Sequence, residues 1–204
     1  MQSGPNLEKQ ERTKRRLEDA FMALYKKNSI EKITVRQVVE LAGVTRSTFY
    51  AYYDSVYGVL EAIEEDLQAG LGPYFEQYSG GILEKAALKP FDSNVKWFDY
   101  CRAHREYLLI LLGPNGDPSF GYKLRKRLKV DINRMMDEDG MLNDNLRKYV
   151  VEYVTGATLA LMYYWLENDD NLSAEEIAVV ANLIRQSKIV IEGMRKDSKK
   201  QPDL

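Results

Sequence analysis

The chain has 204 residues, of which 45% are hydrophobic and 29% are charged, as is typical of an ordinary globular protein. Its single cysteine, Cys101, excludes an intrachain disulfide and favours a reducing compartment, so a cytoplasmic location is expected. There is no signal-like N-terminus, and no uncharged stretch reaches the roughly 18 to 20 residues that a membrane span needs, so neither export nor a membrane partner is expected.

The charge is unevenly distributed along the chain. Residues 1–58 carry ten Lys/Arg and seven Asp/Glu, whereas the remaining residues carry 19 and 24. A modestly basic N-terminal part on an acidic body fits a nucleic-acid-binding head.

The first predicted helix, Leu7–Lys27, is basic at its start. Its apolar residues recur at helical spacing. Positive charge at a helix N-terminus opposes the helix dipole. An external anionic partner therefore explains these residues better than local stabilisation does, although solvated surface charge is the simpler alternative. The basic residues are Lys9, Arg12, Lys14, Arg15 and Arg16.

Two short helices are predicted next, on either side of a glycine. Thr34 and Gln37 have the spacing of a capping box and open the first of them. Gly43 ends that helix, because a tight turn between helices needs a residue with positive φ. Thr45 caps the second helix.

The rest of the chain is also predicted to be helical. A fourth helix opens at Asp54 or Ser55, and glycines and prolines then mark a boundary between two domains, residues 1–65 and 66–204. Asp117 and Ser173 are predicted helix caps. The further helices are expected at residues 91–102, 105–112, 118–137, 144–166 and 173–194. No strand-like alternation is present, so the fold class is all-α: an N-terminal three-helix head and a C-terminal helical bundle.

Residues 34–53 meet the requirements of a helix-turn-helix. Two short helices around a tight turn let the second helix enter a major groove about 12 Å wide. Because caps and glycine turns occur in many helical proteins, these features alone leave a packed helical hairpin as the alternative. The candidate DNA contacts are Thr34, Arg36, Thr45, Arg46, Ser47, Thr48, Tyr50, Tyr52 and Tyr53.

The string ITVRQVVELAGVTRSTFYAYY at Ile33–Tyr53 resembles the DNA-binding head of the TetR family of bacterial transcription regulators. The Ala-Gly-Val-Thr turn, the Thr-Phe-Tyr run and the closing aromatic residue all match, and the likeness covers about residues 10–65. It implies an all-α homodimer that binds duplex DNA at a near-palindromic operator. It also implies a body that holds a ligand pocket and a dimer interface.

Three residues depart from the family pattern. Val39 stands where alanine is usual, and Ser47 stands where glycine is frequent. Val56 stands where a lysine usually opens the fourth helix and contacts phosphate. Contacts to the DNA backbone must then come from elsewhere, with Tyr52, Tyr53 and the basic N-terminal arm as the candidates.

The segment His104–Phe120 is similar to the body of a TetR subgroup that includes regulators of dihydroxyacetone kinase operons. This likeness identifies no ligand. Aromatic residues of the body could line a small-molecule pocket, and core packing is the simpler explanation of each. Such a pocket favours an apolar or aromatic effector, with a triose as the rival that the subgroup suggests. The candidate ligand residues are Trp97, Tyr100, His104, Tyr107, Phe120, Tyr163 and Tyr164.

The last two predicted helices are apolar over more than one face, which indicates packing on both sides. Burial within one subunit is the alternative to a homodimer interface, and the family resemblance favours the interface.

No phosphate loop or nucleophile motif is present, and Cys101 with His104 makes only two of the ligands that a metal site needs. We therefore expect no enzyme activity, no cofactor and no metal. The leading interpretation is a ligand-responsive repressor. The alternative is a coactivator or interaction protein of the same fold with weakened DNA binding, which the absent lysine at Val56 supports.

Overall fold

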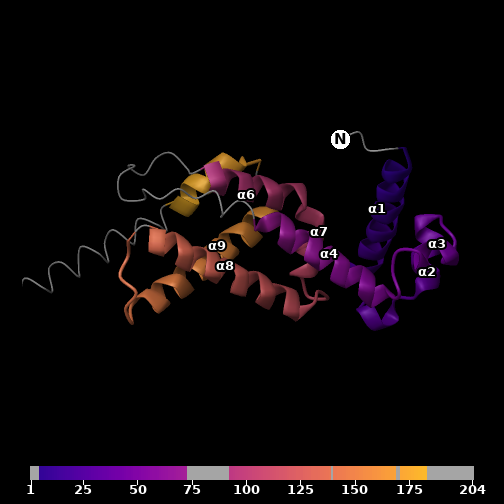
Figure 1. Ribbon diagram of the computed structural model, residues 1–204, viewed down its shortest axis with the longest axis horizontal. Coiled ribbons are helices and arrows are strands. Elements are labelled where there is room, and N and C mark those ends of the chain that lie inside the picture. The colour runs from indigo at the N-terminus through magenta and orange to yellow at the C-terminus, as the bar shows by residue number, and fades with distance from the viewer. Residues whose placement is uncertain (1–4, 73–91, 139, 169–170, 183–204) are drawn as a thin grey trace, which may run out of the picture. The chain divides into compact units, whose positions relative to one another are not determined.

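A computed structural model describes residues 5–72, 92–138, 140–168 and 171–182, and these are helices and connecting turns with no strand among them (Figure 1). This confirms the all-α prediction. The helices are α1 Pro5–Tyr25, α2 Val35–Ala42, α3 Arg46–Tyr50, α4 Val56–Leu71, α6 Asp92–Ala103, α7 Arg105–Leu111, α8 Pro118–Glu138 and α9 Arg147–Asn168, with a 3-10 turn at Ile30–Lys32. Residues 174–182 are also helical. No helix in these ranges is long and apolar enough to cross a membrane.

The caps predicted around the helix-turn-helix are confirmed. The backbone N–H of Thr34 donates to the Gln37 side chain at 2.8 Å, and the Gln37 N–H donates back to Thr34, so both halves of the capping box are present. Gly43 has φ 63° and ψ 40°, in the left-handed region. The Thr45 hydroxyl accepts from the Thr48 N–H at 3.1 Å. Local sequence therefore places both ends of the turn.

The caps of the body follow the same chemistry. Asp117 accepts from the backbone N–H of Ser119 at 2.7 Å, and Pro118 is the first residue of α8. Helix α9 begins three residues later than predicted, because the Asp144 carboxylate accepts from the backbone N–H groups just after it and so acts as the cap. Ser173 donates its N–H to Glu176 at 2.7 Å. Of the helix predicted over 173–194, the part beyond residue 182 lies outside the described residues.

The chain divides into two compact units, and each contains two separate stretches of sequence. The first joins the chain up to Ala69 with Glu106–Gly121, and the second joins Gly70–Arg105 with the chain from Tyr122 onward. Helices α4 and α8 therefore each run from one unit into the other. Residue 65, the boundary expected from the sequence, lies inside α4.

The first unit has an apolar core to which α7 contributes. Phe21 stacks on Tyr25 with 5.4 Å between ring centroids, and burial, with smaller contributions from nearby carboxylates, raises the pKa of Tyr25 to about 12. The Tyr107 hydroxyl of α7 donates to Asp19 of α1 at 2.7 Å. The fully buried residues of this unit include Leu17, Phe21, Val38, Phe49, Val59, Leu108 and Phe120.

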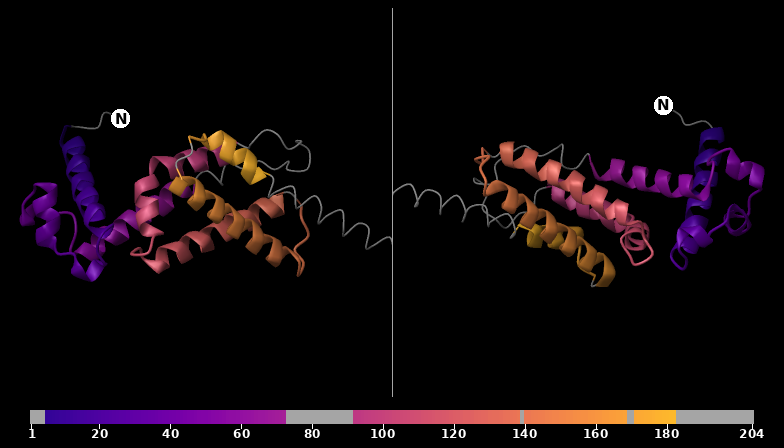
Figure 2. Two further views of the ribbon diagram at one scale, coloured as in Figure 1. Left: turned by 180° about the vertical axis from the view of Figure 1, so that it is seen from behind. Right: turned by 90° about the horizontal axis from the view of Figure 1, so that it is seen from below.

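The second unit is built around α6, α8 and α9. Phe98 of α6 contacts Trp97 and Trp165, with ring centroids 4.9 Å and 5.8 Å apart, and the Trp165 indole donates to the Leu172 carbonyl at 3.1 Å. Helices α8 and α9 cross each other in the left view of Figure 2 and lie side by side in the right view. Arg125 and Glu152 join these two helices through an ion pair of 2.7 Å.

Candidate nucleic-acid interface

The turn between α2 and α3 is held by an arginine from α1. Arg16 donates to the carbonyl oxygens of Ala42 and Gly43, the latter at 3.2 Å. These carbonyls lie at the C-terminal end of α2, where the helix leaves acceptors without internal partners and where positive charge is favourable. Arg16 thus fixes the position of α3 relative to α1.

Helix α3 exposes three side chains that can reach a ligand. Arg46, Ser47 and Tyr50 are exposed, and Tyr50 has 57% of its surface open to solvent. Phe49 on the opposite face is fully buried and anchors the helix. Apolar contact inward and polar groups outward are what a groove-reading helix needs.

Other expected contact residues of this region are engaged within the head. The Thr45 and Thr48 hydroxyls lie 2.9 Å apart and serve the cap of α3. Thr34 serves the cap of α2. Arg36 is exposed and donates to Glu40 at 2.7 Å, a contact that raises the pKa of Arg36. Arg36 can still exchange this partner for phosphate, because both side chains are open to solvent.

The two tyrosines after α3 differ in exposure. The half-buried Tyr52 donates to the Gln10 carbonyl at 3.4 Å, so the N-terminal half of α1 lies beside the end of α3. Tyr53 is buried, and its hydroxyl donates to Glu18 at 2.7 Å. Burial and this carboxylate raise the pKa of Tyr53. Tyr53, expected from the sequence as a DNA contact, therefore belongs to the core of the head.

The basic arm of α1 is smaller than the sequence suggests. Lys14 pairs with Asp66 at 2.7 Å and with Glu18 at 3.6 Å. Together with the structural role of Arg16, this leaves three exposed cations on the arm. They are Lys9, Arg12 and Arg15.

The start of α4 presents a residue that the sequence analysis missed. Val56 is buried, so it makes no contact outside the head. Tyr57 beside it is 54% exposed. The only sequence signal for Tyr57 is an aromatic residue in the first turn of a helix next to the motif, which is too common to single out.

The aromatic residues expected to bind a ligand are divided between the two compact units. Trp97 is buried, and Tyr100 stacks on His104 with ring centroids 4.0 Å apart. Tyr163 is half-buried, whereas Tyr164 is 63% exposed. These five lie in the second compact unit, while the remaining two candidates lie in the first. The remaining two are Tyr107, bonded to Asp19, and Phe120, fully buried.

The single cysteine is part of the core. Cys101 is fully buried, and burial raises the pKa of its thiol well above the ordinary value. Within the described ranges, no group of three His, Cys, Asp or Glu residues gathers in a way that could hold a metal ion.

Sequence comparison relates the chain to transcription regulators. Residues 89–186 match a family model described as the C-terminal region of transcriptional regulators. An uncharacterised HTH-type transcriptional regulator of Bacillus subtilis strain 168, YxbF, is 34% identical over 171 residues, which are 79% of this chain and 42% of the relative. The chain thus spans less than half the length of that curated relative.

Structural comparison finds the same fold in known regulators. A TetR transcriptional regulator from Streptococcus agalactiae 2603V superposes with a TM-score of 0.58 and 22% identity, over 87% of this chain and 95% of the other. DhaS, an activator of a dihydroxyacetone kinase operon, superposes with a TM-score of 0.57 and 18% identity, over 87% and 97%.

Proposed function

We propose that this chain is a transcriptional regulator of the TetR family that binds duplex DNA as a homodimer and represses transcription until a small molecule releases it, and its likeness to regulators of that family supports this. The observation that carries this proposal is the set of exposed side chains on α3, namely Arg46, Ser47 and Tyr50. The Gly43 turn and Arg16 hold this helix in place. In this proposal residues 1–65 contact DNA, and residues 66–204 bind the effector and form the dimer.

Helix α3 enters the major groove with Arg46 as the residue that reads a base. An arginine can donate two hydrogen bonds to the edge of a guanine, which is the commonest specific contact in this groove. Ser47 and Tyr50, exposed on the same short helix, add polar and apolar contacts beside it. Thr45 and Thr48 keep the first turn of α3 in shape rather than reading sequence.

Contacts to the DNA backbone come from α1 and the start of α4. Lys9, Arg12 and Arg15 are exposed, and the bond between Tyr52 and Gln10 places this half of α1 beside α3. Tyr57 supplies a hydroxyl at the N-terminus of α4, where a helix favours an anion.

The dimer forms through the exposed face of α9. Tyr149, Tyr153 and Tyr164 are 67%, 59% and 63% exposed, and they lie on one face of the helix with Gly156 and Ala160 between them. A side chain added at Gly156 would meet nothing within 4 Å, so the middle of this face is open. Small residues flanked by aromatic ones let two helices approach closely while burying apolar surface.

The effector acts on the body, and the sign of regulation is repression. The half-buried Tyr100, Tyr163 and His104 and the buried Trp97 favour an apolar or aromatic effector, with a triose as the rival. A ligand changes DNA affinity only through its different affinities for two states of the protein. A coupling of about 1–3 kcal/mol would change operator affinity roughly 5- to 150-fold.

The test begins with selection of bound sequences from a random DNA library, followed by fluorescence anisotropy on the enriched site. Arg46→Ala should weaken specific binding by about 1–3 kcal/mol for each half-site and relax the preference at one base pair of each half-site. Lys126→Ala, at an exposed residue of α8, is the control and should bind as the wild type does. Unchanged affinity and preference in Arg46→Ala would show that α3 does not read the groove as proposed.

A second variant separates backbone contacts from base reading. Arg15→Ala should weaken binding to selected and random DNA alike, and because the dimer loses one phosphate contact in each subunit, the slope of log affinity against log salt should fall by about 1.8. A loss confined to the selected sequence would place Arg15 at a base instead.

The second candidate function is a coactivator or interaction protein of the same fold. The buried side chain of Val56 favours it, because no cation stands at that position to hold a phosphate. This candidate predicts that the DNA selection enriches no sequence.

A further inference from the structure

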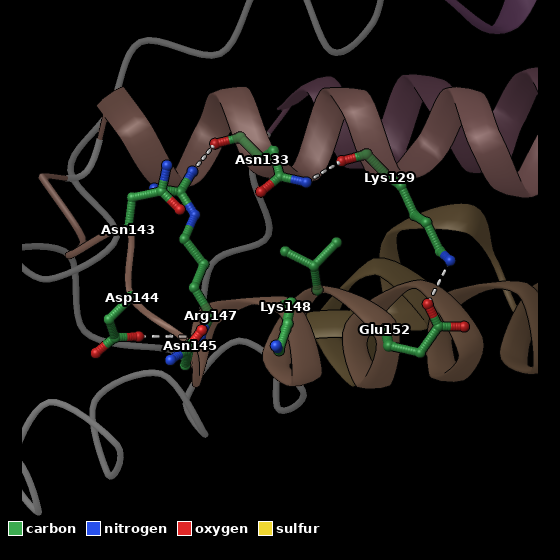
Figure 3. A pocket seen from close by; sticks show the side chains of 9 residues that line it. Lys129, Asn133, Asn143, Asp144, Asn145, Arg147, Lys148 and Glu152 are labelled. Carbon is green, nitrogen blue, oxygen red and sulfur yellow. Dashed lines mark hydrogen bonds and ion pairs between the residues drawn. The ribbon is translucent and has the colours of Figure 1, made fainter.

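A polar hollow lies between α8 and the start of α9, inside the second compact unit. It encloses about 730 Å³, within the range of small-molecule sites in proteins. Figure 3 shows Asn133 and Lys129 along α8, Arg147 at one end and Glu152 at the other. Eight of its nine lining residues are polar: Lys129, Asn133, Asn143, Asp144, Asn145, Arg147, Lys148 and Glu152, with Val151 as the apolar one.

The walls of this hollow are held by bonds within the protein. Arg147, with 3% of its side chain exposed, pairs with Asp137 at 2.7 Å and donates to the Asn133 and Met141 carbonyls. Glu152 pairs with Lys129 across the other end. A frame fixed in this way loses little conformational entropy when a ligand enters.

Three lining residues keep their polar groups available. The exposed side chains of Asn143 and Asn145 make no hydrogen bond to the described part of the chain. Lys148 is also exposed and lies 5.6 Å from the ring of Tyr149, and no described carboxylate pairs with it. Amides both donate and accept, as hydroxyl groups require, and an ammonium attracts an anion.

The local charge favours one negative charge on the ligand. Both lining carboxylates already have partners within the protein. Glu152 forms ion pairs with Lys129 and Arg125, and Asp144 accepts hydrogen bonds from the backbone N–H groups that begin α9. Arg125, Lys129, Arg147 and Lys148 stand against three carboxylates, Asp137, Asp144 and Glu152, so the lining and its partners keep one net positive charge.

We propose that this hollow binds a hydroxylated anion of sugar size, such as a sugar acid or a sugar phosphate. The amides of Asn143, Asn145 and Asn133 take the hydroxyls, Lys148 takes the anionic group, and Val151 contacts the carbon chain. This site shares no residue with the aromatic residues proposed to bind the effector. It gives the body a second ligand of different chemistry.

The test is isothermal titration calorimetry on the full chain without DNA, with gluconate, glucose 6-phosphate and glucose as probes. At least one of the two anions should bind, and glucose should bind at least tenfold more weakly. Lys148→Met and the double variant Asn143→Ala/Asn145→Ala should each weaken binding at least fivefold. Lys126→Met removes an exposed lysine of α8 outside the hollow and should change nothing.

The two anions distinguish a carboxylate from a phosphate as the recognised group, and binding of either supports the site. The proposal is overturned if neither anion binds, if glucose binds as tightly, or if the Lys148 and asparagine variants bind as the wild type does. Because no DNA is present, failure of the proposed DNA binding leaves this result unaffected.

Discussion

At the scale of single residues, Gly43 and Arg16 together decide where α3 begins. Gly43 adopts φ 63°, which costs other residues about 1–2 kcal/mol because their Cβ approaches the backbone. A Cβ at this position would also lie 3.0 Å from the Arg16 guanidinium that holds the turn. The backbone conformation and the packing therefore both select glycine.

Replacing Gly43 by alanine should lower the free energy of unfolding by about 1–2 kcal/mol, measured by urea denaturation followed by circular dichroism. Gly58→Ala is the matched control, because Gly58 lies in α4 with its nearest new contact, the Ser55 hydroxyl, at 3.9 Å. That substitution should stabilise the protein by about 0.5–1 kcal/mol. Equal effects of the two variants would mean that the left-handed turn contributes nothing.

The residues that the sequence predicted correctly are those whose partners are close in sequence. Thr34 and Gln37 are three residues apart, and so are Thr45 and Thr48. The partners of Tyr53, Lys14 and Arg16 lie 35, 52 and 26 residues away. A tyrosine beside a recognition helix has the same local pattern whether it faces DNA or Glu18, so only the packed head distinguishes the two.

At the scale of elements, α9 is apolar on both sides for two different reasons. Val150, Val154 and Trp165 are buried within the subunit, whereas Tyr153 and Tyr164 on the other face are exposed. The sequence predicted two-sided packing here but could not assign the sides, because valine and tyrosine are both compatible with a core or an interface. The structure separates an internal face from an available one.

A charge in the middle of that available face should break the proposed dimer. Ala160→Arg places a guanidinium between Tyr153 and Tyr164 on this face, where burial of a charge without a partner is costly. Sedimentation at micromolar concentration should then show a monomer. Val130→Arg alters an apolar residue of α8 that is 59% exposed, and it should leave the dimer intact. A dimer that tolerates Ala160→Arg but dissociates with Val130→Arg would place the interface on α8.

At the scale of the whole molecule, residues 106–121 belong with the first compact unit although they follow α6 in sequence. Tyr107 donates to Asp19, and Glu106 pairs with Lys26 at 3.4 Å. The sequence pattern places a boundary at residue 65 and does not indicate that residues 106–121 belong to the first unit, because contacts between distant segments leave no local periodicity. The chain thus passes between its two units at three points.

Removing the Tyr107 hydroxyl should loosen the first unit alone. A hydrogen bond contributes about 1 kcal/mol, so Tyr107→Phe should speed amide hydrogen exchange roughly fivefold in the middle of α1 and in α7. Exchange in α9 should stay at the wild-type rate. Tyr122→Phe, at a residue of α8 that is 68% exposed, is the control. Faster exchange in α9 as well would mean that the two units open together.

The discontinuous first unit also limits how this protein can be dissected. A fragment that ends at residue 72 keeps the exposed residues of α1 and α3, but it lacks α7, whose Leu108 and Leu111 are almost fully buried. Such a fragment would expose apolar surface to water and would tend to aggregate on expression. Grafting the proposed DNA specificity onto a known regulator therefore requires the transfer of two segments of sequence, the head and residues 106–121.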